Sequence, residues 1–246
     1  DLRVVYQEAK SGAGLILNDF KVPQPAYYLL AFSLIWLGSD VFHHRIFKGI
    51  RPLQWPVRGL GRLSALAYTT QLLLVGFSAS QMAWTCFAVS TVFFAAYALL
   101  YRRPRLGYIP AAYLPLTIFF LLRNLHQIKW LWPLTIIALL YYIPGYLLRR
   151  TPRGQGWEIT LLFSGLGLAT LTALSAPLQS GLDAAIPVAI AATIWAVEAF
   201  ARRNVWLGFP TNALYLMAYF MILFRLNVDE PQFFSMGAAL LGLIMH

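Results

Sequence analysis

Long apolar stretches recur along the chain, and short polar or basic connections separate them. A membrane-spanning helix needs about 20 predominantly apolar residues. Eight stretches approach this length, and a ninth begins near Phe233. They cover residues 26–42, 63–80, 82–101, 106–122, 130–148, 159–176, 184–201, 206–224 and 233–246. This pattern predicts eight or nine transmembrane helices.

The composition decides between helices and a barrel. The chain is 59% hydrophobic and only 11% charged, whereas a soluble domain carries about 25% charged residues. In hydrocarbon the backbone must satisfy its own polar groups, so only helices and closed barrels span a membrane. Barrel strands alternate in polarity over about ten residues, but these runs are unbroken and rich in Leu, Ala and Ile. We therefore predict an all-α, polytopic integral membrane protein whose main partner is the lipid bilayer.

The basic residues gather in every second connection. Those connections contain Arg45, Lys48, Arg51, Arg58, Arg62, Arg102, Arg103, Arg105, Arg149, Arg150, Arg153, Arg202 and Arg203. Lys and Arg mark cytoplasmic loops of membrane proteins, so we expect these loops in the cytoplasm. Residues 1–25 would then be an extracytoplasmic or interfacial segment of a bacterial inner (plasma) membrane protein. The same clustering accounts for the net charge of +10 without a nucleic-acid partner.

Two parts of the sequence resemble each other. Tyr101-Arg102-Arg103, Leu106-Gly107-Tyr108 and Pro110 are matched by Ala201-Arg202-Arg203, Leu207-Gly208-Phe209 and Pro210, about 100 residues further along. The repeated unit contains four spans, an even number, so both copies would have the same orientation in the membrane. We therefore expect parallel repeats, unlike the inverted repeats common in transporters.

This repeat suggests a division of the chain into four parts. They are the segment 1–25, the first span with its basic loop (26–62), repeat 1 (63–148), and a basic loop followed by repeat 2 (149–246). The sequence starts at Asp1, and its last apolar stretch stops at His246 without a basic flank. We therefore expect a longer parent chain.

Four charged residues within or next to the spans are candidate functional groups. Asp40 and Glu198 are the two acids inside predicted spans, where ionisable groups are costly and often functional. A proton or cation site would require them to converge, whereas a plain ion pair would explain each separately. Glu198 precedes Arg202 by four residues, the spacing of a helical ion pair. Arg123 and Arg225 end equivalent spans and are candidates for an anion or lipid-headgroup site, or for simple anchoring at the membrane surface.

The histidines are candidate ligands for a metal or a chlorophyll-type pigment, with solvated interfacial residues as the alternative. They are His43, His44, His126 and His246. None has the spacing of a zinc-binding helix, and the single cysteine, Cys86, allows no thiolate cluster. We therefore predict no metal site and leave the cofactor open.

Two helices carry small residues at every fourth position. They are Gly165, Ala169 and Ala173 on one predicted span and Ala185, Ala189 and Thr193 on the next. Such stripes let helix backbones approach closely. They are candidate packing faces, either within the bundle or against other membrane subunits.

These features favour a structural or assembly subunit, or the membrane region of a larger multispan protein. A transporter or lipid-handling protein is the first alternative, based on Asp40, Glu198, Arg123 and Arg225. A membrane enzyme or pigment-binding subunit that uses the histidines is the second. The sequence contains no P-loop, nucleophile elbow, kinase signature or dinucleotide fingerprint, so enzymatic activity is the less favoured expectation.

Overall fold

The computed structural model describes residues 24–46, 51–127, 129–151, 154, 156–179, 182–228 and 230–244. The regular elements of this part of the chain are all helical. Its α-helices are α2 (Pro25–Ile46), α3 (Arg51–Val75), α4 (Ser80–Leu100), α5 (Tyr108–Asn124), α6 (Leu131–Leu148), α7 (Trp157–Ser175), α8 (Ala185–Arg202), α9 (Gly208–Arg225) and α10 (Pro231–Ile244). Short 3₁₀ turns are η1 (Pro104–Gly107), η3 (Ala176–Leu178), η4 (Leu182–Ala184) and η5 (Val205–Leu207).

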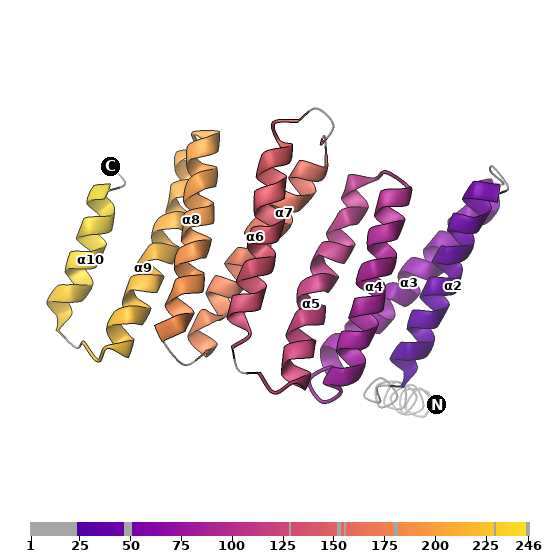
Figure 1. Ribbon diagram of the computed structural model, residues 1–246, viewed down its shortest axis with the longest axis horizontal. Coiled ribbons are helices and arrows are strands. Elements are labelled where there is room, and N and C mark those ends of the chain that lie inside the picture. The colour runs from indigo at the N-terminus through magenta and orange to yellow at the C-terminus, as the bar shows by residue number, and fades with distance from the viewer. Residues whose placement is uncertain are drawn as a thin grey trace, which may run out of the picture.

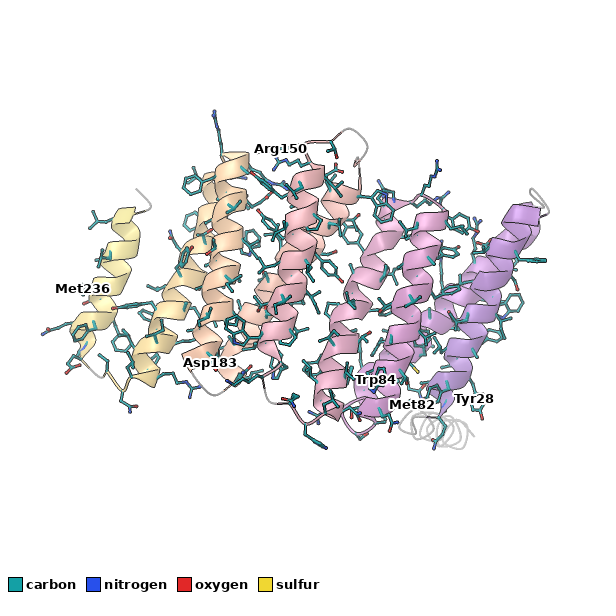
Figure 2. The ribbon with its side chains drawn as sticks, viewed as in Figure 1. Tyr28, Met82, Trp84, Arg150, Asp183 and Met236 are labelled. Carbon is teal, nitrogen blue, oxygen red and sulfur yellow. The ribbon has the colours of Figure 1, made fainter. Side chains whose placement is uncertain are left out.

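The helices stand side by side in an elongated row, from α2 at one end to α10 at the other (Figure 1). The chain reverses direction at each connection. The connections that follow α2, α4, α6 and α8 therefore lie along one edge of the row, and the others lie along the opposite edge (Figure 1). Arg150 lies at the first of these edges and Asp183 at the second (Figure 2). We call the first the basic edge, because Arg102, Arg149 and Arg202 all lie at the ends of helices there.

Seven helical segments of the described chain are long and apolar enough to cross a membrane. They include α2, α4, α6 and α8, and also α5, α7 and α9 together with their adjoining 3₁₀ turns. Large apolar side chains face outward on these helices; Ile35 is 65% exposed, Val92 72% and Leu171 65%. Because water would make such a surface unstable, the chain is an integral membrane protein in contact with a lipid bilayer.

The helix α3 differs from the sequence expectation in where it begins. The charge pattern predicts a basic loop before Leu63, but the helix starts at Arg51 and includes Arg58 and Arg62. Its first half also contains Pro56, Gly59 and Gly61, which have low helix propensity. Packing of α3 against α2, rather than local propensity, therefore accounts for the helix there. The predicted division of the stretches 63–80 and 82–101 into two helices is confirmed, but it falls a few residues earlier, since α3 ends at Val75 and α4 begins at Ser80.

Two buried cores lie in succession along the row. The first core joins α2, α3, α4 and α5 through buried side chains such as Leu37, Tyr68, Phe87 and Phe120. The second joins α6, α7, α8 and α9 in the same way, with smaller side chains such as Ala138, Ala169 and Ala191.

The expected segment 1–25 falls almost wholly outside the described residues, as does His246. The division of the chain at residues 62, 148 and 149 stays a prediction.

Candidate functional site

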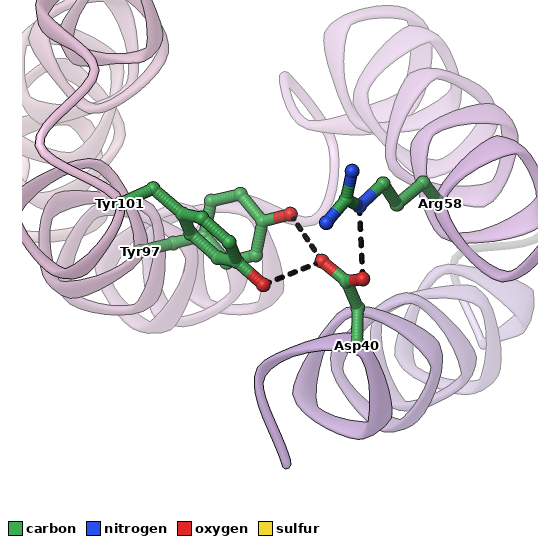
Figure 3. Close-up of polar contacts among 4 residues, drawn as sticks. All are labelled: Asp40, Arg58, Tyr97 and Tyr101. Carbon is green, nitrogen blue, oxygen red and sulfur yellow. Dashed lines mark hydrogen bonds and ion pairs between the residues drawn. The ribbon is translucent and has the colours of Figure 1, made fainter. Parts of the chain in front are cut away.

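Asp40 is the centre of a polar cluster within the first core, close to the basic edge. Its side chain on α2 has no exposed surface. Arg58 on α3 donates from Nε to Asp40 Oδ1 at 2.8 Å. Tyr97 on α4 and Tyr101, which directly follows α4, both donate from their hydroxyls to Oδ2 at 2.8 Å. The phenols approach the carboxylate from one side and the guanidinium from the other (Figure 3).

This donor set suits an ionised carboxylate. Three hydrogen bonds from donors satisfy most of its acceptor positions, and one of them also brings the opposite charge. Burial, followed by the hydrogen bond to Asp40, raises the pKa of the Tyr101 phenol above its ordinary value, which is consistent with a hydroxyl that donates to a carboxylate. Asp40 thus ties α2, α3 and α4 together.

Glu198 is the centre of a second cluster, in the second core. Its side chain on α8 is 1% exposed. Arg202, one turn later on α8, donates from Nε to Glu198 Oε1, which confirms the ion pair that the four-residue spacing predicts. Arg149, which follows α6, places NH1 3.8 Å from the same oxygen. Tyr142 on α6 donates to Oε2 at 3.3 Å.

The two acids do not come together. Asp40 and its phenol partner Tyr97 lie in the first core, whereas Tyr142 belongs to the second core together with its partner Glu198. Both clusters link the first helix of a core to the third. In the first core the acid is on the first helix and the phenol on the third; in the second core the acid is on the third helix and the phenol on the first. The arrangement forms two separate cross-links rather than one shared ion site.

A recess borders the second cluster. It has a volume of about 290 Å³, and its walls include Glu198, Arg202, Phe163, Leu166 and Trp195. The walls are mainly apolar, with the ion pair at one end.

Arg123 and Arg225 lie at the opposite edge and make equivalent contacts. Arg123, at the end of α5, donates from Nε and NH2 to the carbonyl of Phe77 at 3.2 and 3.1 Å. Arg225, at the end of α9, donates from NH2 to the carbonyl of Gln179 at 3.2 Å. Each bond bridges 46 residues of sequence. Both arginines therefore bind main-chain carbonyls that follow the end of a neighbouring helix.

A second recess of about 490 Å³ lies beside Arg123. Its lining includes His126, Ser80, Gln127 and Trp130. The Arg123 guanidinium also stacks over the Phe77 ring, 4.9 Å from its centroid. The structure thus brings together two predicted candidates, Arg123 and His126, at a polar recess along the edge of the row opposite the basic edge.

The other histidines cannot be placed in a site. His43 and His44 fall in the last turns of α2, but their side chains are outside the described set, as is the whole of His246. Within the described residues no three His, Cys, Asp or Glu side chains gather in a way that could hold a metal ion.

The small-residue stripe of α7 is buried inside the row. Gly165 is buried, and Ala169 and Ala173 are 1% and 0% exposed. A β-carbon on Gly165 would lie 2.8 Å from the backbone nitrogen of Tyr142 and 3.0 Å from the Ala138 carbonyl. The glycine therefore lets α6 and α7 touch.

The small-residue stripe of α8 is buried at its start and exposed at its end. Ala185 is buried, Ala189 is half-buried and Thr193 is exposed. The Thr193 hydroxyl contacts the Tyr215 hydroxyl on α9 at 2.9 Å.

Sequence reasoning missed most of the partners of the two acids. The charge pattern placed Arg58 and Arg149 only among the basic loop residues, and no functional role was assigned to Tyr97, Tyr101 or Tyr142. One signal was available: Tyr97 and Tyr101 are four residues apart, so they lie on one helix face. That face could be assigned to Asp40 only once the packing of α2 against α4 was known.

These observations define the class of the protein: an all-helical integral membrane protein built as a row of helical hairpins, with its buried charges paired inside each core. No model of a known protein family matches the chain, and comparisons with curated protein sequences and with solved structures also gave no match.

Proposed function

We propose that the chain is a structural or assembly region of a larger multispan membrane system, and not itself a carrier of ions or solutes. The observation that supports this most directly is the local pairing of both buried acids. Asp40 and Glu198 each bind an arginine and a tyrosine of their own core, so both act as links between helices.

A transport site would place different demands on these residues. A carrier needs intramembrane polar groups that face one substrate pathway and exchange partners during the cycle. Here the acids are in separate cores, and Asp40 already has three donors. Removing one partner of a buried ion pair destabilises a protein by about 3–5 kcal/mol. Substrate binding would have to supply this free energy each time the bonds to Asp40 were exchanged.

We further propose that the row consists of parallel four-helix repeats and that all nine helices α2–α10 cross the membrane. Left-handed backbone at Arg102 and His126 recurs at Arg203 and Asn227. Both pairs are 101 residues apart, like Leu106-Gly107 and Leu207-Gly208. In this alignment Arg102 corresponds to Arg203 rather than to Arg202. Arg123 and Arg225 also make equivalent bonds to main-chain carbonyls, at a spacing one residue longer than that of the left-handed positions. The two cores favour units that begin at α2 and α6, one helix earlier than the sequence division.

The orientation follows from charge. Arginines end α6 and α8 at the basic edge, whereas Lys129 and Asp183 pair with each other at the opposite edge, 2.6 Å apart. With basic loops retained in the cytoplasm, the basic edge would be cytoplasmic.

Reconstitution tests the proposal. The purified chain is placed in liposomes that contain a pH-sensitive dye, together with Asp40→Asn and Glu198→Gln variants. We expect proton flux equal to that of empty liposomes for all three proteins. A flux of the wild-type chain above that background would overturn the proposal, and its loss in a variant would assign the flux to that acid.

The assembly part has its own test. Particles that contain the chain are extracted from the native membrane with their surrounding lipid, and their mass is measured. This mass is compared with that of the 27.7 kDa chain alone in the same lipid. We expect a heavier particle with a partner subunit in fixed proportion. A lone chain would contradict an assembly role.

The recess beside Arg123 supports lipid handling as a second candidate function. It combines a guanidinium, an imidazole and Trp130 at the level of the membrane surface, a combination suited to a phospholipid headgroup. Native mass spectrometry in mixed lipids would detect it as an anionic lipid retained by the wild type and lost from Arg123→Gln. Equal retention by both proteins would remove this candidate.

A further inference from the structure

The start of α7 covers the connection between α4 and α5. The Trp157 ring lies so close to Gly107 that a β-carbon on this glycine would be 2.9 Å from it. Thr160 donates from Oγ1 to the carbonyl of Pro104 at 3.0 Å. Gly156, at φ +90°, packs against the Pro104 ring, and this backbone conformation favours glycine. A small residue, an aromatic residue and, one turn later, a hydroxyl residue thus seal η1.

The equivalent connection between α8 and α9 is open. A β-carbon on Gly208, which corresponds to Gly107, would meet no atom within 4 Å. Val205 is 84% exposed, Trp206 77% and Phe209 65%. These residues belong to η5 and to the first turn of α9, at the place that α7 covers in the first unit.

A recess of about 400 Å³ marks this place. Its lining includes Gly208, Phe209, Phe200, Asn204 and Asn212. Together with the exposed side chains of Val205, Trp206 and Phe209, the recess forms an apolar surface suited to packing by another helix.

We infer that this recess, at η5 and the start of α9, is the docking site for one further membrane-spanning helix of the α7 type. Such a helix begins with a small residue followed by an aromatic one, and has a hydroxyl residue one turn later. This inference rests on the proposed repeat, because it transfers the contact of α7 with η1 to the equivalent position at η5.

The geometry favours a helix over loosely held lipid. Gly208 permits the backbone of a helix to approach closely, as small residues do at membrane helix interfaces. The aromatic side chain would take the place on Gly208 that Trp157 has on Gly107. The helix would lie beside α10, which already packs on α9 through the hydrogen bond from the Tyr219 hydroxyl to the Phe233 carbonyl at 2.8 Å.

A cross-linking experiment tests the docking site with a helix of known sequence. The probe is a synthetic peptide of residues 154–178 that carries Thr160→Cys. It is added to nanodiscs that hold the full chain with Gly208→Cys, and disulfide formation is measured under mild oxidation. The control chain carries Gly38→Cys, since Gly38 is also a helix glycine on which a β-carbon would meet no atom within 4 Å.

We expect about tenfold more cross-linked product at position 208 than at position 38, a ratio that needs only about 1.4 kcal/mol of preferential binding. A peptide that also carries Trp157→Ala should lose this preference. Equal yields at both positions would overturn the inference, as would a product that consists mainly of two Gly208→Cys chains joined to each other. A failure here, with proton flux still at background, would remove the docking site and leave the proposed structural role intact.

Discussion

The hydroxyl of Tyr97 donates a hydrogen bond of 2.8 Å to Asp40 and so joins α4 to α2 across 57 residues of sequence. The second core repeats the link between its first and third helices, from Tyr142 to Glu198, across 56 residues. The acid and the phenol have exchanged helices. The two cores therefore share a cross-link between their first and third helices near the basic edge. They differ in which of the two helices carries the acid.

Asp40→Asn should destabilise the chain by about 2–3 kcal/mol. Breaking a fully buried ion pair costs about 3–5 kcal/mol, and the 28% exposure of Arg58 lets solvent recover part of that loss. Unfolding in mixed detergent micelles measures the change. The matched control is Asp183→Asn, because Asp183 and Lys129 pair at the surface with 50% and 69% exposure. That variant should lose less than about 1 kcal/mol, and equal losses would contradict the role of Asp40.

Tyr97→Phe and Tyr101→Phe should be strongly non-additive. Both hydroxyls donate to the same oxygen of Asp40, so either one alone leaves that oxygen satisfied. We expect each single variant to cost about 0.5–1.5 kcal/mol, and the double variant to cost more than the two together because Oδ2 then has no phenol donor. A double-mutant cycle on the free energy of unfolding measures this coupling. Simple additivity would show that the phenols act independently.

Gly165→Ala and Gly167→Ala should have opposite effects although they are two residues apart on α7. The added methyl group at 165 would meet the backbone of α6 at 2.8 Å, and such overpacking costs about 1–3 kcal/mol. At 167 it meets no atom within 4 Å, so that variant should gain up to about 1 kcal/mol from helix propensity. The unfolding temperatures of the two proteins decide the matter. Similar values would mean that α6 and α7 are not in contact at Gly165.

Arg123→Met should lower stability more than Arg225→Met. Arg123 donates two hydrogen bonds to Phe77 and stacks on its ring, whereas Arg225 donates one to Gln179. A net hydrogen bond contributes about 0.5–1.5 kcal/mol, so we expect losses of about 1–2 and 0.5–1 kcal/mol respectively. Arg105→Met, at an exposed position on the basic edge, is the control for loss of charge alone. If it matched Arg123→Met, the carbonyl contact would contribute nothing.

The sequence predicted the positions of most helices well, but it did not predict which helices pack against each other. Apolar length located α4, α6 and α8 to within two or three residues, because hydrocarbon thickness fixes the length of a span. It misjudged α3, where Arg58 and Arg62 resemble loop residues although they are helical. Local spacing also predicted the pairing of Glu198 with Arg202, since both are on one helix.

The sequence by itself determined that this is a helical membrane protein, how its apolar segments are divided, and which edge is basic, because all three depend on composition and on spacing along the chain. Only the tertiary structure decided that Asp40 and Glu198 are separate, that Tyr97 and Tyr142 are their partners, and that the connection at Gly208 is open. Those facts depend on which helix faces which, and lipid-facing and helix-facing positions are equally apolar in a membrane protein. Hydrophobicity therefore marks the helices but carries little information about their packing.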